Sequence, residues 1–437
     1  MQLATTTRLI DSVRRLARPL RDPRDLDPLM ARIGEARYVL LGEATHGTSD
    51  FYTWRAQLSR RLIEEKGFSF VAVEGDWPDC YRVNRYVKGA TDAGASAEEV
   101  LTNFARWPTW MWANREVQEF TEWLRGHNNA VPVEAKTGFY GLDVYSLWES
   151  MEAVLAYLDR VDSTAAAAAR RAFVCFEPYR RDVQEYAWAT RLVPSTCEDE
   201  VVELLSELRR KAQEFREEGR EGFFNAEQNA LVLKNAERYY RTMVSAGAES
   251  WNVRDRHMVE TLERLMAHHG PQARAIVWEH NTHIGDARYT DMAADGMVNV
   301  GELVREQHPT ADVVLVGFAT HRGTVIAGSE WGAPMRRMRV PSAIEESWEY
   351  VLHEAFEGDR LMIFAGDPGP ELMDPRGHRA IGVVYNPGYE RRGNYVPTVL
   401  RRRYDALLHV DETAALHPIQ MEATDRTEVP ETFPSGV

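Results

Sequence analysis

The sequence predicts an α/β fold: a mostly parallel central sheet flanked by helices, with a large helical insertion that covers a cleft. Three observations support this prediction: short continuous apolar runs, helical periods between them, and one long section without a strand signal. Continuous rather than alternating hydrophobicity is typical of a strand buried on both faces. Strands that alternate with helices imply right-handed crossovers, and therefore parallel pairing.

Six apolar runs are the predicted strands, and most of them end at polar residues. They are residues 38–41, 70–73, 139–142, 275–278, 313–317 and 361–364. The predicted helices lie between them and show apolar side chains at intervals of three and four residues. They are residues 51–65, 147–158, 201–215 and 252–269, preceded by a short amphipathic helix near the N-terminus that carries Leu9, Ile10, Val13 and Leu16. The helix over 252–269 should end at Gly270-Pro271, because these residues terminate helices.

We expect a single α/β domain over residues 1–420. Residues of about 147–270 would form its helical lobe on the α/β core. The remaining segment, 421–437, is polar and contains proline, so we expect a loosely ordered tail.

Composition narrows the class of protein. The chain has 437 residues, of which 44% are hydrophobic and 27% charged, so a substantial core is available. A net charge of −15 argues against nonspecific binding of nucleic acid or anionic lipid. No apolar run approaches the thickness of a bilayer, and the N-terminus lacks the apolar segment of a secretory signal. The sequence therefore predicts a cytoplasmic protein without a nucleic-acid or membrane partner.

The three cysteines, Cys80, Cys175 and Cys197, are widely scattered. This distribution excludes a disulfide framework or a thiolate zinc site and fits a reducing compartment. Cys80 follows Asp76 and Asp79, whose charges should raise the pKa of its thiol and disfavour a thiolate nucleophile.

Titratable side chains follow five of the predicted strands. They are Glu43 and His46, Glu74 and Asp76, Asp143, the run Glu279-His280-Asn281-Thr282-His283, and His321. One such residue is more often a helix cap or a satisfied polar group than a catalyst. Because ligands of open α/β sheets bind beyond the carboxyl ends of the strands, the topology itself would bring these five groups together. Their convergence predicts an active site.

The motifs of several enzyme classes are absent: there is no GxSxG elbow, no P-loop, no GxGxxG after the first strand and no HExxH. Histidines and carboxylates without a covalent nucleophile suit two chemistries. In the first, His46 is a general base oriented by Glu43 or Glu74, and Arg55 supplies positive charge. In the second, His46, His280, His283 and one or both glutamates hold a metal ion. The residues alone leave both open.

The motifs GEATHG (42–47), VEGDW (73–77) and WEHNTHIG (278–285) together resemble the erythromycin esterase family. So do WNVRDRHM (251–258) and YDALLHVDETAALHP (404–418), so that the resemblance covers about residues 30–420. It implies hydrolysis of a macrolide lactone by water in the members that are resistance enzymes. It also implies that His46 activates the water, that Glu43 and Glu74 orient it, and that Arg55, His280 and His283 complete the site.

Four further residues, Asp76, Asp143, Arg254 and His321, are the predicted substrate-binding groups, and no cofactor or metal is expected. Arg254 and Asp255 match a recurring pattern, although a structural ion pair explains them equally well. The sequence resembles the wider family more than its antibiotic-resistance branch. An ester or lactone of a bulky small molecule is therefore the predicted substrate, and the alternatives are elimination or cyclisation in a biosynthetic pathway, metal-dependent hydrolysis, or binding without catalysis.

Four tryptophans lie within seventeen residues: Trp107, Trp110, Trp112 and Trp123. We interpret them first as large rings of a helix that pack into the core. The alternative interpretation is an apolar wall for a bulky ligand.

Overall fold

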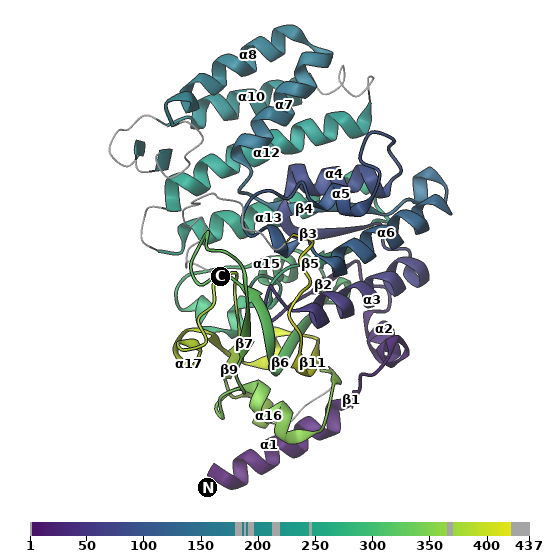
Figure 1. Ribbon diagram of the computed structural model, residues 1–437, viewed down its shortest axis with the longest axis vertical. Helices are drawn as coiled ribbons and strands as arrows, with labels where there is room; N and C mark the ends of the chain where they lie inside the picture. The colour runs from purple at the N-terminus through teal and green to yellow at the C-terminus, as the bar shows by residue number, and fades with distance from the viewer. Residues whose placement is uncertain are drawn as a thin grey trace.

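A nine-stranded mixed sheet lies at the centre of the described chain. The computed structural model describes residues 2–179, 186–187, 189–190, 196–211, 219–243, 247–364 and 370–420. Within these residues the strands follow the order β1-β8-β11-β6-β2-β5-β3-β4, and β7 pairs with the far end of β6 (Figure 1). Their bounds are β1 Ala17–Pro19, β2 Tyr38–Leu41, β3 Phe70–Asp76, β4 Gly138–Asp143, β5 Ala275–Trp278, β6 Val313–Ala327, β7 Arg336–Val340, β8 Arg360–Ile363 and β11 Ala406–Thr413. A separate pair is formed by β9 Arg376–Arg379 and β10 Tyr395–Thr398.

The predicted α/β class is confirmed. All six predicted strands form, and the pairs β3–β4, β3–β5, β2–β5, β2–β6 and β6–β11 are parallel. Antiparallel pairing is confined to β1–β8, β8–β11 and β6–β7 within the sheet described here. β6 runs ten residues beyond the predicted end at 317, because β7 and β11 both pair with its extension.

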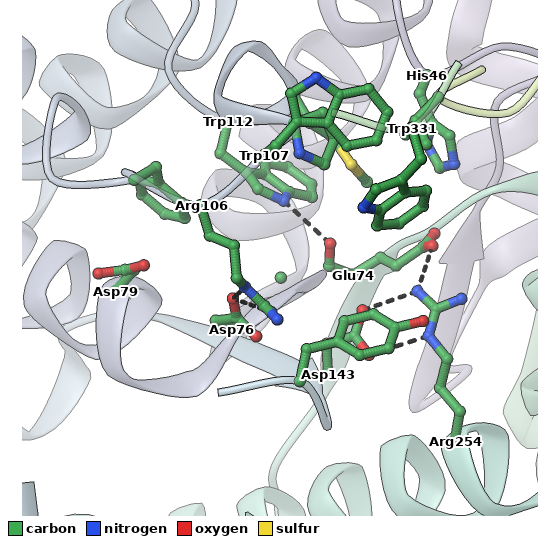
Figure 2. A pocket seen from close by; sticks show the side chains of 16 residues that line it. His46, Glu74, Asp76, Asp79, Arg106, Trp107, Trp112, Asp143, Arg254 and Trp331 are labelled. Carbon is green, nitrogen blue, oxygen red and sulfur yellow. Dashed lines mark hydrogen bonds and ion pairs between the residues drawn. The ribbon is translucent and has the colours of Figure 1, made fainter. Parts of the chain in front are cut away.

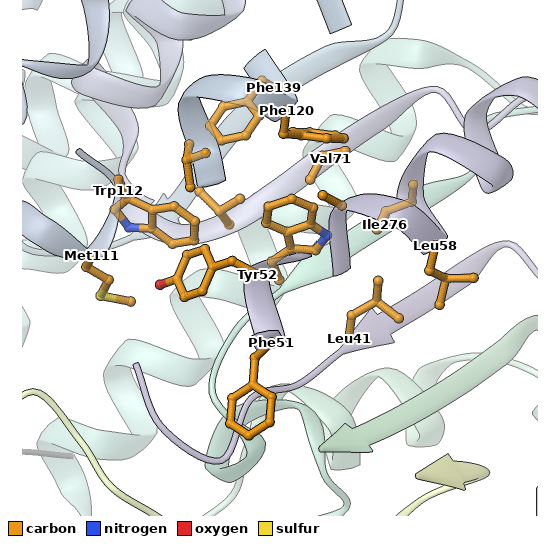
Figure 3. Close-up of a cluster of buried hydrophobic side chains, with 14 of the residues drawn as sticks. Leu41, Phe51, Tyr52, Leu58, Val71, Met111, Trp112, Phe120, Phe139 and Ile276 are labelled. Carbon is orange, nitrogen blue, oxygen red and sulfur yellow. The ribbon is translucent and has the colours of Figure 1, made fainter. Parts of the chain in front are cut away.

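Helices cover both faces of the sheet. On one face, Leu41, Val71 and Ile276 pack against Phe51 and Leu58 of α3 (Ser49–Lys66) and Phe120 of α6 (Arg115–Asn129) (Figure 3). On the other face, Leu40, Ala72 and Val277 pack against Met258 and Leu262 of α13 (Glu249–His269). Both faces are therefore buried, as the continuous apolar runs predicted.

The predicted helices form with small shifts at their ends. The helix over 51–65 is α3, that over 147–158 is α7 (Leu147–Val161), that over 252–269 is α13, and the N-terminal one is α1 (Gln2–Leu16). α13 ends at Gly270, whose positive φ of 97° is easily reached by glycine. The remaining helices near the sheet are α2 Asp27–Ile33, α4 Trp77–Val87, α5 Ala97–Leu101, α14 Asn281–Ile284, α15 Val300–Gln307, α16 Trp348–Ala355, α17 Glu390–Gly393 and α18 Leu400–Arg403, with short 3-10 turns between elements.

A helical lobe lies at one end of the molecule, away from β6, β7 and β11 (Figure 1). It contains α7, α8 (Ser163–Phe173), α10 (Glu198–Arg210) and α12 (Arg220–Met243), which share one buried apolar cluster. α10 corresponds to the helix predicted over 201–215, and residues 212–215 lie outside the described residues. α13 was predicted within the lobe, but most of its apolar side chains pack on the sheet.

One prediction about the cysteines was wrong. Cys175 and Cys197 form a disulfide in the helical lobe, with their Cα atoms 5.9 Å apart. Their separation of 22 residues gave no signal for this pairing, because the fold brings the two positions together. Cys80 is free and buried. Burial is the main cause that holds the pKa of its thiol well above the ordinary range, and the charge of Asp79 raises that pKa further, as predicted.

The described helices include none that is both long and apolar enough to cross a lipid bilayer. The predicted tail, residues 421–437, lies outside the described residues.

Candidate active site

The carboxyl ends of β2, β3 and β4 open into one cleft, as the topology predicted. His46, Glu74, Asp76 and Asp143 all line it, together with Arg254 from α13 (Figure 2). Three tryptophans, Trp107, Trp112 and Trp331, gather on the side of the cleft opposite Asp76, Asp143 and Arg254 (Figure 2). An aromatic wall thus faces a charged floor.

His46 is held from behind by a buried ion pair. Its Nδ1 lies 2.8 Å from Oε1 of Glu43, and Oε2 of Glu43 lies 2.7 Å from a terminal nitrogen of Arg55. Glu43 and Arg55 are fully buried, and the Arg55 guanidinium also lies over the rings of Tyr52 and Trp278. A carboxylate only accepts hydrogen bonds, so in this contact Nδ1 of His46 is the donor, and Nε2 is the ring nitrogen that remains for the cleft.

Gly42 serves a different purpose from a simple turn. A Cβ atom on Gly42 would lie 2.1 Å from Oδ1 of Asn281, so only glycine lets the β2 and β5 ends approach this closely. The backbone N–H of Asn281 donates to the carbonyl of Glu43 at 2.9 Å. This contact fixes the GEATHG loop against the EHNTH segment.

Glu74 is an ionised acceptor on the cleft floor. Its Oε1 accepts from Arg254 at 2.7 Å, and its Oε2 accepts from the backbone N–H of His280 at 2.8 Å. Burial alone would raise the pKa of Glu74, but its electrostatic interactions with His283, Arg254 and His46 outweigh burial and hold that pKa well below the usual range. Arg254 also binds Asp143 through two nitrogens, at 2.9 and 2.7 Å.

His280 and His283 lie behind the cleft and do not line it. Nδ1 of His280 accepts from the Thr282 backbone at 3.3 Å, and burial, followed by the charge of His46, holds the pKa of His280 well below the usual range. His280 is therefore neutral, and its ring centre lies 4.8 Å from that of His46.

His283 connects α13 to the floor of the cleft. Its Nδ1 lies 2.9 Å from Asp255 and its Nε2 lies 3.0 Å from a terminal nitrogen of Arg254, while its ring stacks on Trp251. Both predicted residues of α13, Arg254 and Asp255, therefore belong to this network, Arg254 in the cleft and Asp255 behind it.

His321 does not join this group. It lies on the extension of β6, its ring stacks on that of His353 with centres 3.8 Å apart, and it does not line the cleft. Of the ten predicted site residues, five line the cleft, four stand directly behind them, and His321 lies elsewhere.

Sequence reasoning missed several groups at the site. Asp79 and Tyr145 line the cleft, as does Arg106, which binds Asp76 at 3.0 Å. Burial raises the pKa of Asp76 to about 6 and that of Asp79 to about 7, so both carboxyls titrate near neutrality. Glu279, which the sequence placed among the strand-end groups but to which no role was given, is fully buried beside Glu74, and burial holds its pKa well above the usual range. No local pattern in the sequence marked Tyr145.

The tryptophan-rich segment is divided between the core and the cleft. Trp110 is buried in the core, whereas Trp107 and Trp112 line the cleft, and Trp112 donates to the carbonyl of Glu74 at 3.0 Å. Of the four, only Trp123 lies within a long helix, α6. Trp110 lies in a 3-10 turn, Thr109–Met111, and the two tryptophans that line the cleft lie on either side of this turn.

Among the described residues, no three histidine, cysteine, aspartate or glutamate side chains gather in a way that could hold a metal ion. The guanidinium of Arg254 explains part of this arrangement, since it lies between Glu74, Asp143 and His283 and uses their acceptor atoms.

A family model for erythromycin esterase matches residues 63–413, which is most of the chain. The chain belongs to the erythromycin esterase family. The matched range begins after Arg55, so the roles expected of Glu43, His46 and Arg55 depend on the GEATHG motif and on their geometry.

Relatives of the family agree with this assignment. The chain is 28% identical over 120 residues to the erythromycin esterase type II of Escherichia coli, a segment that covers 28% of this chain and 26% of that protein. The chain thus spans about a quarter of the length of this relative.

Three solved structures share the fold. A succinoglycan biosynthesis protein has a TM-score of 0.78 at 21% identity, with 95% of this chain and 99% of that chain covered. A protein from Bacillus cereus has a TM-score of 0.79 at 19% identity, with the same coverage. A mutant of the erythromycin esterase EreC, in its open conformation, has a TM-score of 0.65 at 16% identity, with 90% and 94% covered.

Proposed function

We propose that this protein hydrolyses an ester or lactone of a bulky small molecule, with His46 as the general base. The observation that carries the proposal is the orientation of the His46 ring. Its Nδ1 is bound to Glu43, whose charge is balanced by Arg55, and the ring lines the cleft. General-base catalysis needs an imidazole whose Nδ1 is held by a carboxylate and whose Nε2 faces the substrate cleft.

In the proposed reaction, Nε2 of His46 takes a proton from a water molecule as the water oxygen attacks the carbonyl carbon. The electron pair of the carbonyl double bond moves to its oxygen, and a tetrahedral oxyanion forms. The oxyanion then collapses and breaks the bond to the leaving alkoxide, which receives the proton from His46. The Glu43–Arg55 pair stabilises the imidazolium between these two steps.

Glu74 supports the same chemistry from the cleft floor. It is ionised and accepts only, so a water between Glu74 and His46 would direct one proton to each and its lone pair to the substrate. The bonds from Arg254 and from the His280 backbone fix the carboxylate in place. The tryptophan wall supplies apolar contact for the body of the substrate.

The geometry of the site bears on the type of reaction more directly than on the identity of the substrate. One structural relative is named a succinoglycan biosynthesis protein, so acylated saccharides belong among the compounds to be tested beside macrolides. The name of EreC points to macrolide lactones in the same way. Elimination or cyclisation by the same base would consume no water, so the mass of the product distinguishes these reactions from hydrolysis.

The test is incubation of the wild-type protein and the His46→Ala variant with macrolides, aryl esters, simple lactones and acylated saccharides, with and without chelator. Mass spectrometry should detect the gain of one water by at least one compound, lost in the variant and unaffected by chelator. Loss of activity on chelation would favour the metal-dependent alternative. Equal turnover by the variant would overturn the assignment of His46.

A further inference from the structure

Tyr145 has an unused hydrogen-bonding group in the cleft. It lies two residues beyond β4, lines the cleft and is only 9% exposed. Its Oη is buried and has no partner at hydrogen-bonding distance and angle within the described part of the chain, although the neighbouring Tyr239 helps to raise its pKa. A buried hydroxyl without a partner is costly, and native proteins retain one mainly where a ligand or water completes it.

The surroundings hold Tyr145 in place without using its hydroxyl. The backbone carbonyl of Tyr145 accepts from the hydroxyl of Tyr240 at 2.9 Å, and the ring of Tyr239 packs edge-on at 5.2 Å between ring centres. The guanidinium groups of Arg254 and Arg106 lie over the Tyr145 ring, 4.9 and 5.1 Å from its centre. Ring and backbone are therefore fixed, and the O–H group stays available.

The other donors on the cleft floor are already engaged. Arg254 uses Nε and Nη2 for Asp143 and Glu74, and its Nη1 lies 3.0 Å from His283. Arg106 binds Asp76. A developing oxyanion needs a donor that is not committed to a protein carboxylate, and Tyr145 meets this requirement.

We propose that Tyr145 is a catalytic residue whose hydroxyl donates a hydrogen bond to the carbonyl oxygen of the bound ester. This inference rests on the proposed function and adds the group that stabilises the oxyanion. The proton stays on Tyr145 while the carbonyl oxygen gains charge, and the same bond weakens again as the oxyanion collapses. Burial holds the pKa of Tyr145 well above the usual range, so the hydroxyl is protonated throughout the range of an ordinary assay.

The decisive variant is Tyr145→Phe, which removes one oxygen atom and retains the ring. Because that oxygen bonds to no described protein group, the melting temperature should be unchanged or higher, while kcat/KM falls by about 10²-fold through kcat. Tyr86→Phe is the matched control: the Tyr86 hydroxyl binds Glu122 at 2.9 and 3.0 Å, outside the cleft. It should lower the melting temperature and leave kcat/KM unchanged.

A second arm does not depend on turnover. Binding of phenyl acetate to the His46→Ala protein, measured by saturation-transfer NMR, should weaken at least fivefold when Tyr145→Phe is added. If the proposed function is wrong, no hydrolysis will be detected, but Tyr145→Phe will still weaken the binding of phenyl acetate. The role of Tyr145 is overturned if Tyr145→Phe lowers the melting temperature as Tyr86→Phe does, or if it changes neither kcat/KM nor the binding of phenyl acetate.

Discussion

Two buried glutamate–histidine pairs in this protein have nearly the same local geometry but different surroundings. Glu43 binds Nδ1 of His46 at 2.8 Å, and Glu349 binds Nδ1 of His378 at 2.6 Å. All four side chains are at most 2% exposed. Each glutamate also lies close to an arginine: Arg55 pairs with Glu43, and the backbone N–H of Arg379 donates to Glu349.

The difference lies at the other ring nitrogen. His46 lines the cleft. His378 does not line it, and its Nε2 lies 3.3 Å from the side-chain amide of Asn281. A carboxylate–imidazole pair is therefore not by itself a sign of catalysis. Its function is decided by what the second nitrogen can reach, which is a property of the whole fold.

The same substitution made in each of the two pairs tests this comparison, and it has the largest expected effect. Glu43→Gln should lower the rate of hydrolysis by roughly 10²–10⁴-fold, because the amide no longer fixes the tautomer or stabilises the imidazolium of His46. Because the Glu349–His378 pair lies outside the cleft, Glu349→Gln should change the rate by less than about threefold. Steady-state kinetics on a compound identified by the mass-spectrometric panel provides the measurement.

Both variants should remain folded, which circular dichroism checks before the rates are compared. Equal losses of activity in the two variants would show that access to the cleft does not distinguish the pairs. The same substitution at two sites of equal burial removes the general effect of losing a buried charge from the comparison.

The next effect concerns stability and sharpens the role of Arg55. Arg55→Met keeps the length of the side chain but leaves the carboxylate of Glu43 buried without a cation. Breaking a buried pair from one side costs about 3–5 kcal/mol, so we expect a loss of this size in the free energy of unfolding. Urea denaturation measures it. The double variant Arg55→Met/Glu43→Gln should recover part of the loss; no recovery would mean that Arg55 acts through packing on Tyr52 and Trp278 instead.

Much of the fold was predictable because buried parallel strands have a strong local signal. β2, β3, β5 and the first part of β6 are continuous apolar runs, and each was expected where it occurs. β7 has the sequence RRMRV and was missed, since its strand conformation comes from pairing with the end of β6. β11 was missed because its apolar residues are followed at once by His409, Asp411 and Glu412.

The candidate site was predictable to the extent that strand ends determine it. Glu43 and His46 follow β2, Glu74 and Asp143 lie among the last residues of β3 and β4, and topology alone brought them together. Tyr145 and Trp331 line the same cleft from loops whose course no local pattern fixes. His321 shows the opposite limit: it follows the predicted end of a strand, but that strand continues past it and carries the side chain to another cluster.

That cluster contains another histidine–carboxylate pair and gives the smallest predicted effect. His353 binds Asp411 at 2.7 Å, and His321 stacks on His353 with Arg379 and His409 nearby. Burial, followed by the charge of His353, lowers the pKa of His321 to about 4. A histidine whose pKa is lower in the folded than in the unfolded chain binds fewer protons when folded, so stability falls as the pH drops from about 6.5 towards 4.

Replacement of His321 by phenylalanine should retain the stacking on His353 and remove this proton linkage. The wild-type protein should lose roughly 1 kcal/mol more stability than His321→Phe between pH 7 and pH 5. Urea unfolding of both proteins at the two pH values gives the difference. His257 and His269, whose pKa values burial also lowers, to about 4 and about 3, contribute equally to both proteins and cancel. If the two proteins lose the same stability on acidification, the stacked pair binds a proton in the folded protein without loss of stability. Burial would then have a different effect at this cluster than at the Glu43–His46 pair.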